Sequence, residues 1–239
     1  ITVFVLPAYL PTNGLLGWWP FNGNAKDESG NGYDGVVNGA TLSTDRFGAN
    51  QSSYAFASGQ TSITTSLLPP TQTGERSISV WFEIDPTIGS GEKIMVSYGG
   101  LTPSTGISLG FFYLNYPDEA LVIDIGASFY AFKANFRGGF NNLVLTYTPA
   151  DGNTVAAFKL YFNGKRLEQS YSYNNTAQID TGETTTLKFG SSTSSAAEEQ
   201  SYKGILDDIA IYNRALSPEE ISALYLANAK PQSLSLIHI

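Results

Sequence analysis

Oxygen-bearing side chains are concentrated in one segment near the start of the chain, between residues 22 and 35. They are Asn22, Asn24, Asp27, Glu28, Ser29, Asn31 and Asp34, and glycines lie between them. Hard cations such as calcium take about six to eight oxygen ligands from flexible loops of this kind. The same residue types also cap turns by accepting hydrogen bonds from nearby amides. The segment alone is therefore compatible with a cation site or with a hydrogen-bonded turn.

The spacing in this segment does not make an EF-hand. Asp27–Gly32 fits the first six positions of an EF-hand loop, but Asn38 stands where a bidentate glutamate is needed. No flanking helices are predicted either. A cation held here would need a further ligand from another part of the chain.

Asp207 is the candidate for that ligand. In the predicted strand 205–212, alternation places it on the same face as Ile205, Ile209 and Ile211. This is the more apolar face, and burying a carboxylate there is unfavourable unless it binds a cation or accepts hydrogen bonds. Either a metal or the amides of an adjacent loop would satisfy it.

The composition excludes several other kinds of chemistry. With 13 basic and 21 acidic residues, the formal net charge is 13 − 21 = −8, which provides no positive surface for nucleic acid or an anionic membrane. Cysteine is absent, so disulfides and thiolate zinc sites are impossible. The single histidine, His238, is the penultimate residue, which disfavours a Ser-His-Asp triad. No stretch of about 18 apolar residues predicts a membrane span.

The elements that must position these residues are mostly short strands. Residues 77–84 alternate, with Ile78, Val80, Phe82 and Ile84 on one face, which predicts a half-buried antiparallel strand. The turn residues of 149–153 and the Asn163-Gly164 pair predict tight connections between further strands. About a dozen such strands indicate an all-β sandwich.

One helix is predicted near the end of the chain. Ser217 is a candidate N-cap, Pro218 fits the first helical position, and Glu220 can complete a capping box. Apolar residues follow at helical spacing, and Pro231 prevents further extension. We expect the apolar stripe of this helix to cover an edge of the sandwich.

Two terminal motifs resemble those of a known family. Residues 13–35 are similar to the opening, and residues 202–221 to the closing strand and helix, of LamG-like (laminin G-like, concanavalin A-like) jelly-roll domains of bacterial surface proteins. Residues 44–48, 77–84 and 159–164 fall in the order expected for that family. Phe140 stands where the family often has tryptophan, and Asn163-Gly164 replaces its usual Asp-Gly.

The resemblance implies a fold and a metal. It implies an antiparallel jelly-roll β-sandwich of the concanavalin A type with a short C-terminal helix, and often a structural calcium ion that joins the first loop to the last strand. Matched motif by motif, Asp27 and Asp207 are the expected calcium ligands, with Asn31 or a nearby carbonyl as a third. The resemblance covers about residues 13–229, so residues 1–12 are expected to be an N-terminal segment or linker and residues 230–239 a tail or fragment end.

The same fold hosts glycoside hydrolases, which need two carboxylates that flank the scissile bond. In members of one type these come from a Glu-x-Asp-x-x-Glu strand. Glu83 and Asp85 begin that pattern, but Ile88 stands at the position of the second glutamate. A catalytic role is therefore not expected.

Sugar binding without catalysis requires aromatic rings and polar groups on an accessible face. The candidates are Trp81, on the less apolar face of its strand, and Tyr161, Tyr171 and Tyr173. Each ring could instead serve ordinary packing.

We therefore expect a non-catalytic carbohydrate-binding or adhesion module of a secreted or cell-surface bacterial protein. Its partner would be a glycan or cell-surface polysaccharide, with no nucleic acid and no membrane insertion, and contacts with other domains of the same polypeptide are compatible with this. The alternatives are a structural spacer or protein-interaction module and, third, a glycoside hydrolase-like domain.

Overall fold

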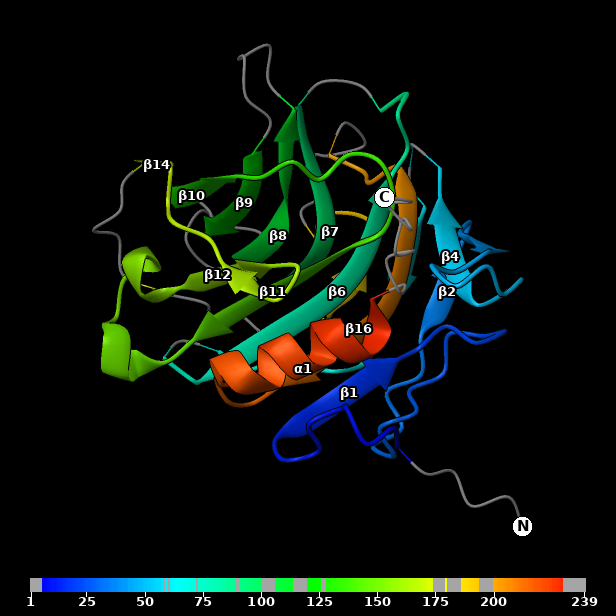
Figure 1. Ribbon diagram of the computed structural model, residues 1–239, viewed down its shortest axis with the longest axis horizontal. Helices are drawn as coiled ribbons and strands as arrows, with labels where there is room; N and C mark the ends of the chain where they lie inside the picture. The colour runs from blue at the N-terminus through cyan, green and yellow to red at the C-terminus, as the bar shows by residue number, and fades with distance from the viewer. Residues whose placement is uncertain are drawn as a thin grey trace, which may run out of the picture.

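Short antiparallel strands form two sheets in the computed structural model (Figure 1). It describes residues 6–57, 59, 61–71, 73–88, 91–99, 106–113, 120–125, 128–173, 179, 186–193 and 200–229. The predicted all-β sandwich with one short C-terminal helix is confirmed. Among the described helices, none is long and apolar enough to cross a membrane.

The first sheet contains the strands nearest the two ends of the chain. Its order is β13 (Lys165–Arg166), β12 (Lys159–Phe162), β11 (Asn141–Tyr147), β6 (Arg76–Ile84), β16 (Gly204–Tyr212), β4 (Ser53–Phe56) and β3 (Thr41–Ser43), and β1 (Leu15–Trp19) also pairs with β16. The first and last strands of the chain, β1 and β16, are thus hydrogen-bonded neighbours.

The second sheet is built largely from the middle of the chain. Its order is β14 (Tyr171–Tyr173), β10 (Ser128–Lys133), β9 (Ala120–Ile125), β8 (Gly106–Tyr113), β7 (Gly91–Gly99), β15 (Lys188–Phe189), β5 (Ser62–Thr64) and β2 (Val36–Asn38). Two 3-10 turns, Pro149–Asp151 and Val155–Ala157, lie between β11 and β12.

The main hydrophobic core lies between the two sheets and includes Trp19, Phe82, Ile123, Leu145 and Phe189. A second, smaller cluster lies on the opposite face of the first sheet, where helix α1 (Pro218–Asn228) covers it (Figure 1). Its members are Leu10, Trp18, Val144, Tyr161, Ala210, Tyr212, Leu216, Ile221 and Leu224. The first sheet is therefore buried on both faces, and β6, predicted to be half-buried, is buried almost throughout.

Helix α1 begins as the sequence predicts. The Ser217 hydroxyl accepts a hydrogen bond from the Glu220 amide, and the Glu220 carboxylate accepts one from the Ser217 amide, so the capping box is complete. Arg214 donates to both carboxylate oxygens of Glu220, which fixes the side chain of the capping residue. The start of the helix is thus anchored to the end of β16.

Part of the N-terminal segment 1–12 packs against the first sheet. Leu10 is buried in the cluster beneath α1, and Leu6 and Tyr9 pack against that cluster. Residues 6–12 therefore belong to the packed domain, whereas residues 1–5 and 230–239 lie outside the described part of the chain.

A bulge in β16 changes which residues face the core. Asp208 has a positive φ of 42°, and the register with β6 shifts between Asp207 and Ala210. Leu206 and Ile209 both face the core as a result. Asp207, paired with Trp81 of β6, lies on the face that α1 covers. The prediction that Asp207 shares the core face with Ile209 was wrong, because strict alternation fails at a bulge.

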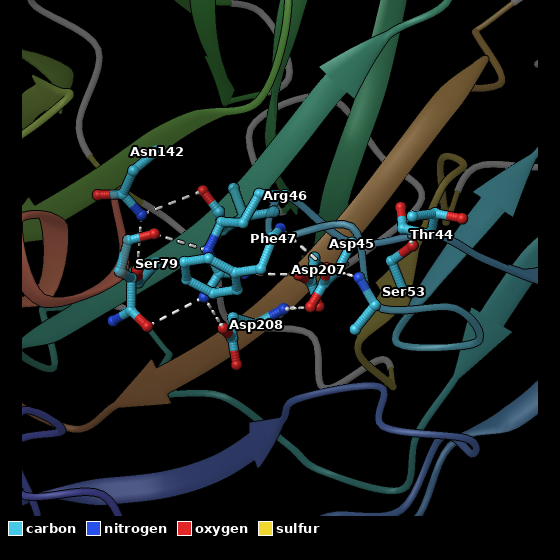
Figure 2. A network of polar contacts seen from close by, with 12 residues as sticks. Thr44, Asp45, Arg46, Phe47, Ser53, Ser79, Asn142, Asp207 and Asp208 are labelled. Carbon is cyan, nitrogen blue, oxygen red and sulfur yellow. Dashed lines mark hydrogen bonds and ion pairs between the residues drawn. The ribbon is translucent and has the colours of Figure 1, made fainter. Parts of the chain in front are cut away.

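Asp207 is only 1% exposed, and a buried arginine neutralises it. Nη1 of Arg46 lies 2.6 Å from Oδ2 of Asp207, and Nη2 forms an ion pair with Asp208 (Figure 2). Nε of Arg46 donates to the carbonyl of Asn228 at 2.9 Å, and Nη2 to the Asn228 side chain at 3.0 Å. We call Arg46, Asp207, Asp208 and Asn228 the Arg46 cluster.

The Arg46 cluster is enclosed by aromatic rings. The guanidinium carbon lies 4.6 Å from the centre of the Trp81 ring and 4.5 Å from that of Phe47. Trp81 in turn stacks on Tyr225 of α1. A single side chain from the loop after β3 thus connects β16, β6 and the end of α1.

Replacing Arg46 should destabilise the protein strongly. Arg46→Ala leaves Asp207 buried without a cation, which typically costs about 3–5 kcal/mol. Arg46→Lys keeps the charge but loses the planar donors, so we expect an intermediate loss. Urea unfolding measures both. Lys159→Ala, which removes the more exposed ion pair with Asp151, is the control and should cost less than ~1 kcal/mol. A loss for Arg46→Ala no larger than this control would contradict the role assigned to the cluster.

Candidate functional site

Asp27 and Asn31 fasten the segment 22–35 to strand β1. Oδ1 of Asp27 accepts hydrogen bonds from the amides of Trp18 and Ser29, and Oδ2 accepts one from the amide of Tyr33. The Asn31 amide group donates to the carbonyls of Leu15 and Leu16. Both side chains therefore act in a hydrogen-bonded turn, one of the two alternatives that the sequence left open.

The three residues expected to bind calcium do not make a fitting ligand set. Both carboxylate oxygens of Asp27 accept amide hydrogen bonds, and Asp207 is bound by the Arg46 guanidinium. Within the described ranges, no group of three or more His, Cys, Asp or Glu side chains is arranged to hold a metal ion. In this structure the cation that Asp207 meets is Arg46.

The aromatic residues expected to bind sugar are also placed differently. Trp81 and Tyr161 are 4% and 6% exposed, because α1 lies over both. Neither ring can receive a ligand there, so these two assignments were wrong. The side chains of Tyr171 and Tyr173 lie outside the described residues, although their backbones form β14 opposite Ala131 and Phe129 of β10.

The face of the second sheet that points away from the core carries polar and acidic side chains as well as apolar ones. Val96, Leu109, Ile123 and Tyr130 face the core. The positions between them form rows on the opposite face, which we call the outer face. One row runs Ile94, Gly110, Val122, Ala131, and the next runs Ser97, Ser108, Asp124, Phe129. Glu92 occupies a third row opposite Phe112.

A carboxyl pair lies at the centre of the outer face. Glu92 of β7 and Asp124 of β9 are hydrogen-bonded to each other across β8. Gln200 donates from Nε2 to Oε2 of Glu92 at 2.7 Å. In the register of the three strands, Gly110 lies between the two acidic residues, so no side chain of β8 separates them.

Gly110 is required at this point because the neighbouring backbone is very close. A Cβ on Gly110 would lie 2.1 Å from the carbonyl oxygen of Lys93. The bulge in β7, between Ile94 and Val96, accompanies this close approach. Any larger residue would push β7 and β8 apart and disturb the carboxyl pair.

Both acids hold a proton more tightly than they would in water. Burial, then the charge of Asp124 and the hydrogen bond to it, raises the pKa of Glu92 to about 8. Burial raises the pKa of Asp124 to about 6, and the hydrogen bond with Glu92 opposes this. Oδ1 of Asp124 is buried and accepts no hydrogen bond among the described residues. Since two carboxylates in contact repel each other, the pair holds one proton near neutral pH.

This pair was not among the residues expected from the sequence. Asp124 is a single carboxylate within the apolar run Leu121–Ile125, so the reasoning applied to Asp207 would have singled it out as well. Glu92 lies 32 residues earlier, and its proximity depends on strand order, which the sequence does not reveal.

The pair should make stability depend on pH. The folded state keeps a proton that the unfolded chain loses above about pH 4.5, so stability should fall as the pH rises from 5 to 8. Glu92→Gln should flatten this fall, by about 1.4 kcal/mol for each unit of pKa shift removed. Thermal or urea unfolding at several pH values measures this pH dependence. Glu28→Gln, a substitution on the segment bound to β1, is the control. Parallel profiles for wild type and Glu92→Gln would contradict proton sharing.

Comparisons with known proteins agree with the architecture. Residues 56–222 match the concanavalin A-like lectin/glucanases superfamily. No curated protein matches the chain.

Solved structures with this fold include sugar-bound domains. Domain 4 of AbnA, a GH43 extracellular arabinanase from Geobacillus stearothermophilus, in complex with arabinotriose, is 17% identical, with a TM-score of 0.61 over 88% of this chain and 98% of that one. The ligand-binding domain of botulinum neurotoxin serotype D with N-acetylneuraminic acid is 15% identical, with a TM-score of 0.59 over 91% of this chain and 52% of that one.

Trypanosoma rangeli sialidase is 17% identical, with a TM-score of 0.61 over 95% of this chain and 35% of that one. The chain thus spans about half of the toxin domain's length and about a third of the sialidase's. Such low identities show the fold alone. The family match, by contrast, covers more than half of the sequence, and the chain belongs to the concanavalin A-like lectin/glucanases superfamily.

Proposed function

We propose that this chain is a non-catalytic carbohydrate-binding module of a secreted or cell-surface protein, and that sugar binds at the outer face of the second sheet. The single observation that carries the proposal is the polar centre of that face, where Glu92, Asp124 and Gln200 meet while remaining partly exposed. Phe129 lies beside Asp124 in the register and is also partly exposed. Hydrogen-bonding groups next to an aromatic ring are the usual composition of a sugar site.

The two outer faces of the sandwich differ at their centres. On the second sheet Ile94, Val122 and Ala131 are buried, but Glu92, Asp124 and Phe129 stay partly exposed, and this favours the second sheet. Helix α1 and residues 6–12 cover the first sheet, so Trp81 and Tyr161 are enclosed. The structural neighbours support a sugar ligand in general terms, since one is described with arabinotriose and another with N-acetylneuraminic acid. Export is part of the proposal. It is supported by the resemblance to surface-protein domains and by the extracellular arabinanase among these neighbours.

A binding role fits the carboxyl pair better than hydrolysis does. Retaining glycosidases hold their two carboxyl groups ~5–5.5 Å apart, and inverting enzymes hold them farther apart. Glu92 and Asp124 are instead hydrogen-bonded to each other, an arrangement that favours a shared proton over two carboxyl groups that flank a scissile bond. We therefore include no catalytic step.

Binding should depend on the outer face. On an array of plant, bacterial and animal glycans, we expect the wild-type chain to bind at least one oligosaccharide. Phe129→Ala should weaken that binding about tenfold, which corresponds to ~1.4 kcal/mol. Phe47→Ala, which truncates an exposed ring beside Arg46, is the matched control and should leave it unchanged. The absence of any glycan signal from the folded chain would favour a spacer or protein-interaction role instead, and glycan hydrolysis would contradict the non-catalytic proposal.

Calcium should not be needed for stability, because Arg46 occupies the place of the expected cation at Asp207. A ligand that binds only the native state raises its melting temperature. We expect equal melting temperatures in excess EDTA and in millimolar calcium. A clear stabilisation by calcium that Asp27→Asn abolishes would show that the family's metal is present after all.

A further inference from the structure

The carboxyl pair also bears on which sugars the outer face can accept, an inference that rests on the proposed function. The pair shares one proton near neutral pH and so keeps one negative charge in a partly buried position. A charge in such a place is screened less by water and salt than one at the open surface. A ligand group that approaches the centre of this face therefore meets a local negative field.

The other charged residues that the structure describes at outer-face positions do not cancel this field at the centre. Lys133 of β10 is exposed and pairs with Ala120 of β9. It lies in the same row as Glu92, but three strands away from it. Lys188 of β15 lies opposite Ser97, and its ammonium group donates to the carbonyl of Ser192. Gln200, which contacts Glu92 directly, is neutral.

We infer that Glu92 and Asp124 are specificity-determining residues that make this face a binding site for neutral or amino sugars and disfavour sugars that carry a carboxylate. A hydroxyl or ammonium group can donate to the pair. A sialic or uronic acid would instead place a second negative charge beside it, which costs binding energy in this environment. The structural neighbour that is described with N-acetylneuraminic acid therefore shares the fold without predicting this ligand.

The discrimination should change with pH in a definite direction. At pH 5 the pair is largely protonated and uncharged, and at pH 8 part of it carries two charges. Preference for neutral over acidic sugars should consequently grow as the pH rises. A sialic or uronic acid keeps its charge across this interval, so the change originates in the protein.

Matched pairs of immobilised sugars test this. The array would present each neutral oligosaccharide beside its acidic counterpart, such as lactose with 3′-sialyllactose and xylotetraose with its glucuronic-acid-substituted form, at pH 5 and pH 8 in low salt. We expect a neutral-to-acidic affinity ratio of at least about tenfold at pH 8 that narrows at pH 5. Glu92→Gln and Asp124→Asn should lower the ratio at pH 8, while Glu28→Gln should not.

The outcomes separate this inference from the proposed function. Binding with a ratio near one, or one that does not change with pH in the wild-type chain, would overturn the specificity and leave the sugar-binding role intact. The absence of binding to every sugar would overturn both. The wild-type pH comparison needs no substitution, so it decides the matter even if one variant fails to fold, which circular dichroism and thermal melting would reveal.

Discussion

The buried guanidinium of Arg46 is the interaction on which the arrangement of this domain depends. It forms ion pairs with two adjacent carboxylates of the last strand and donates a hydrogen bond to the end of the helix. These groups come from positions about 160–180 residues away from Arg46 in the chain. Because these ionic groups are buried together, removing one of them would leave the charge of its partner uncompensated. The same contacts hold the end of the helix against the first sheet.

This fastening gives the sandwich two unlike sides. On one side, an aromatic and aliphatic layer fills the space under α1 and removes its rings from solvent. On the other, the central strands of the second sheet carry two partly exposed acids and a ring, and the Gln200 amide contacts one of the acids. We therefore place the proposed sugar site on the second side.

The strands, the helix and the general architecture could be predicted, because alternation, turn residues and the capping box are local signals. Ser217 and Glu220 meet as expected. The orientation of Asp207 could not be predicted, because a single extra residue in β16 reverses the alternation without any change in composition. The exposure of Trp81 depends on a helix more than 130 residues later. The Glu92–Asp124 pair requires the order of three strands, which is a property of the tertiary structure.

The bulge at Asp208 also bears on how this strand can vary in length. Asp207 and Ala210 pair with Trp81 and Ser79, which are only two positions apart in β6, so β16 contains one residue more than its partner here. Removing Asp208 would restore plain alternation with Leu206, Ile209 and Ile211 still facing the core and Asp207 still facing the helix. Two related chains that differ in length by one residue here would therefore build the same interior, and the shorter one would lack the second carboxylate that binds Arg46.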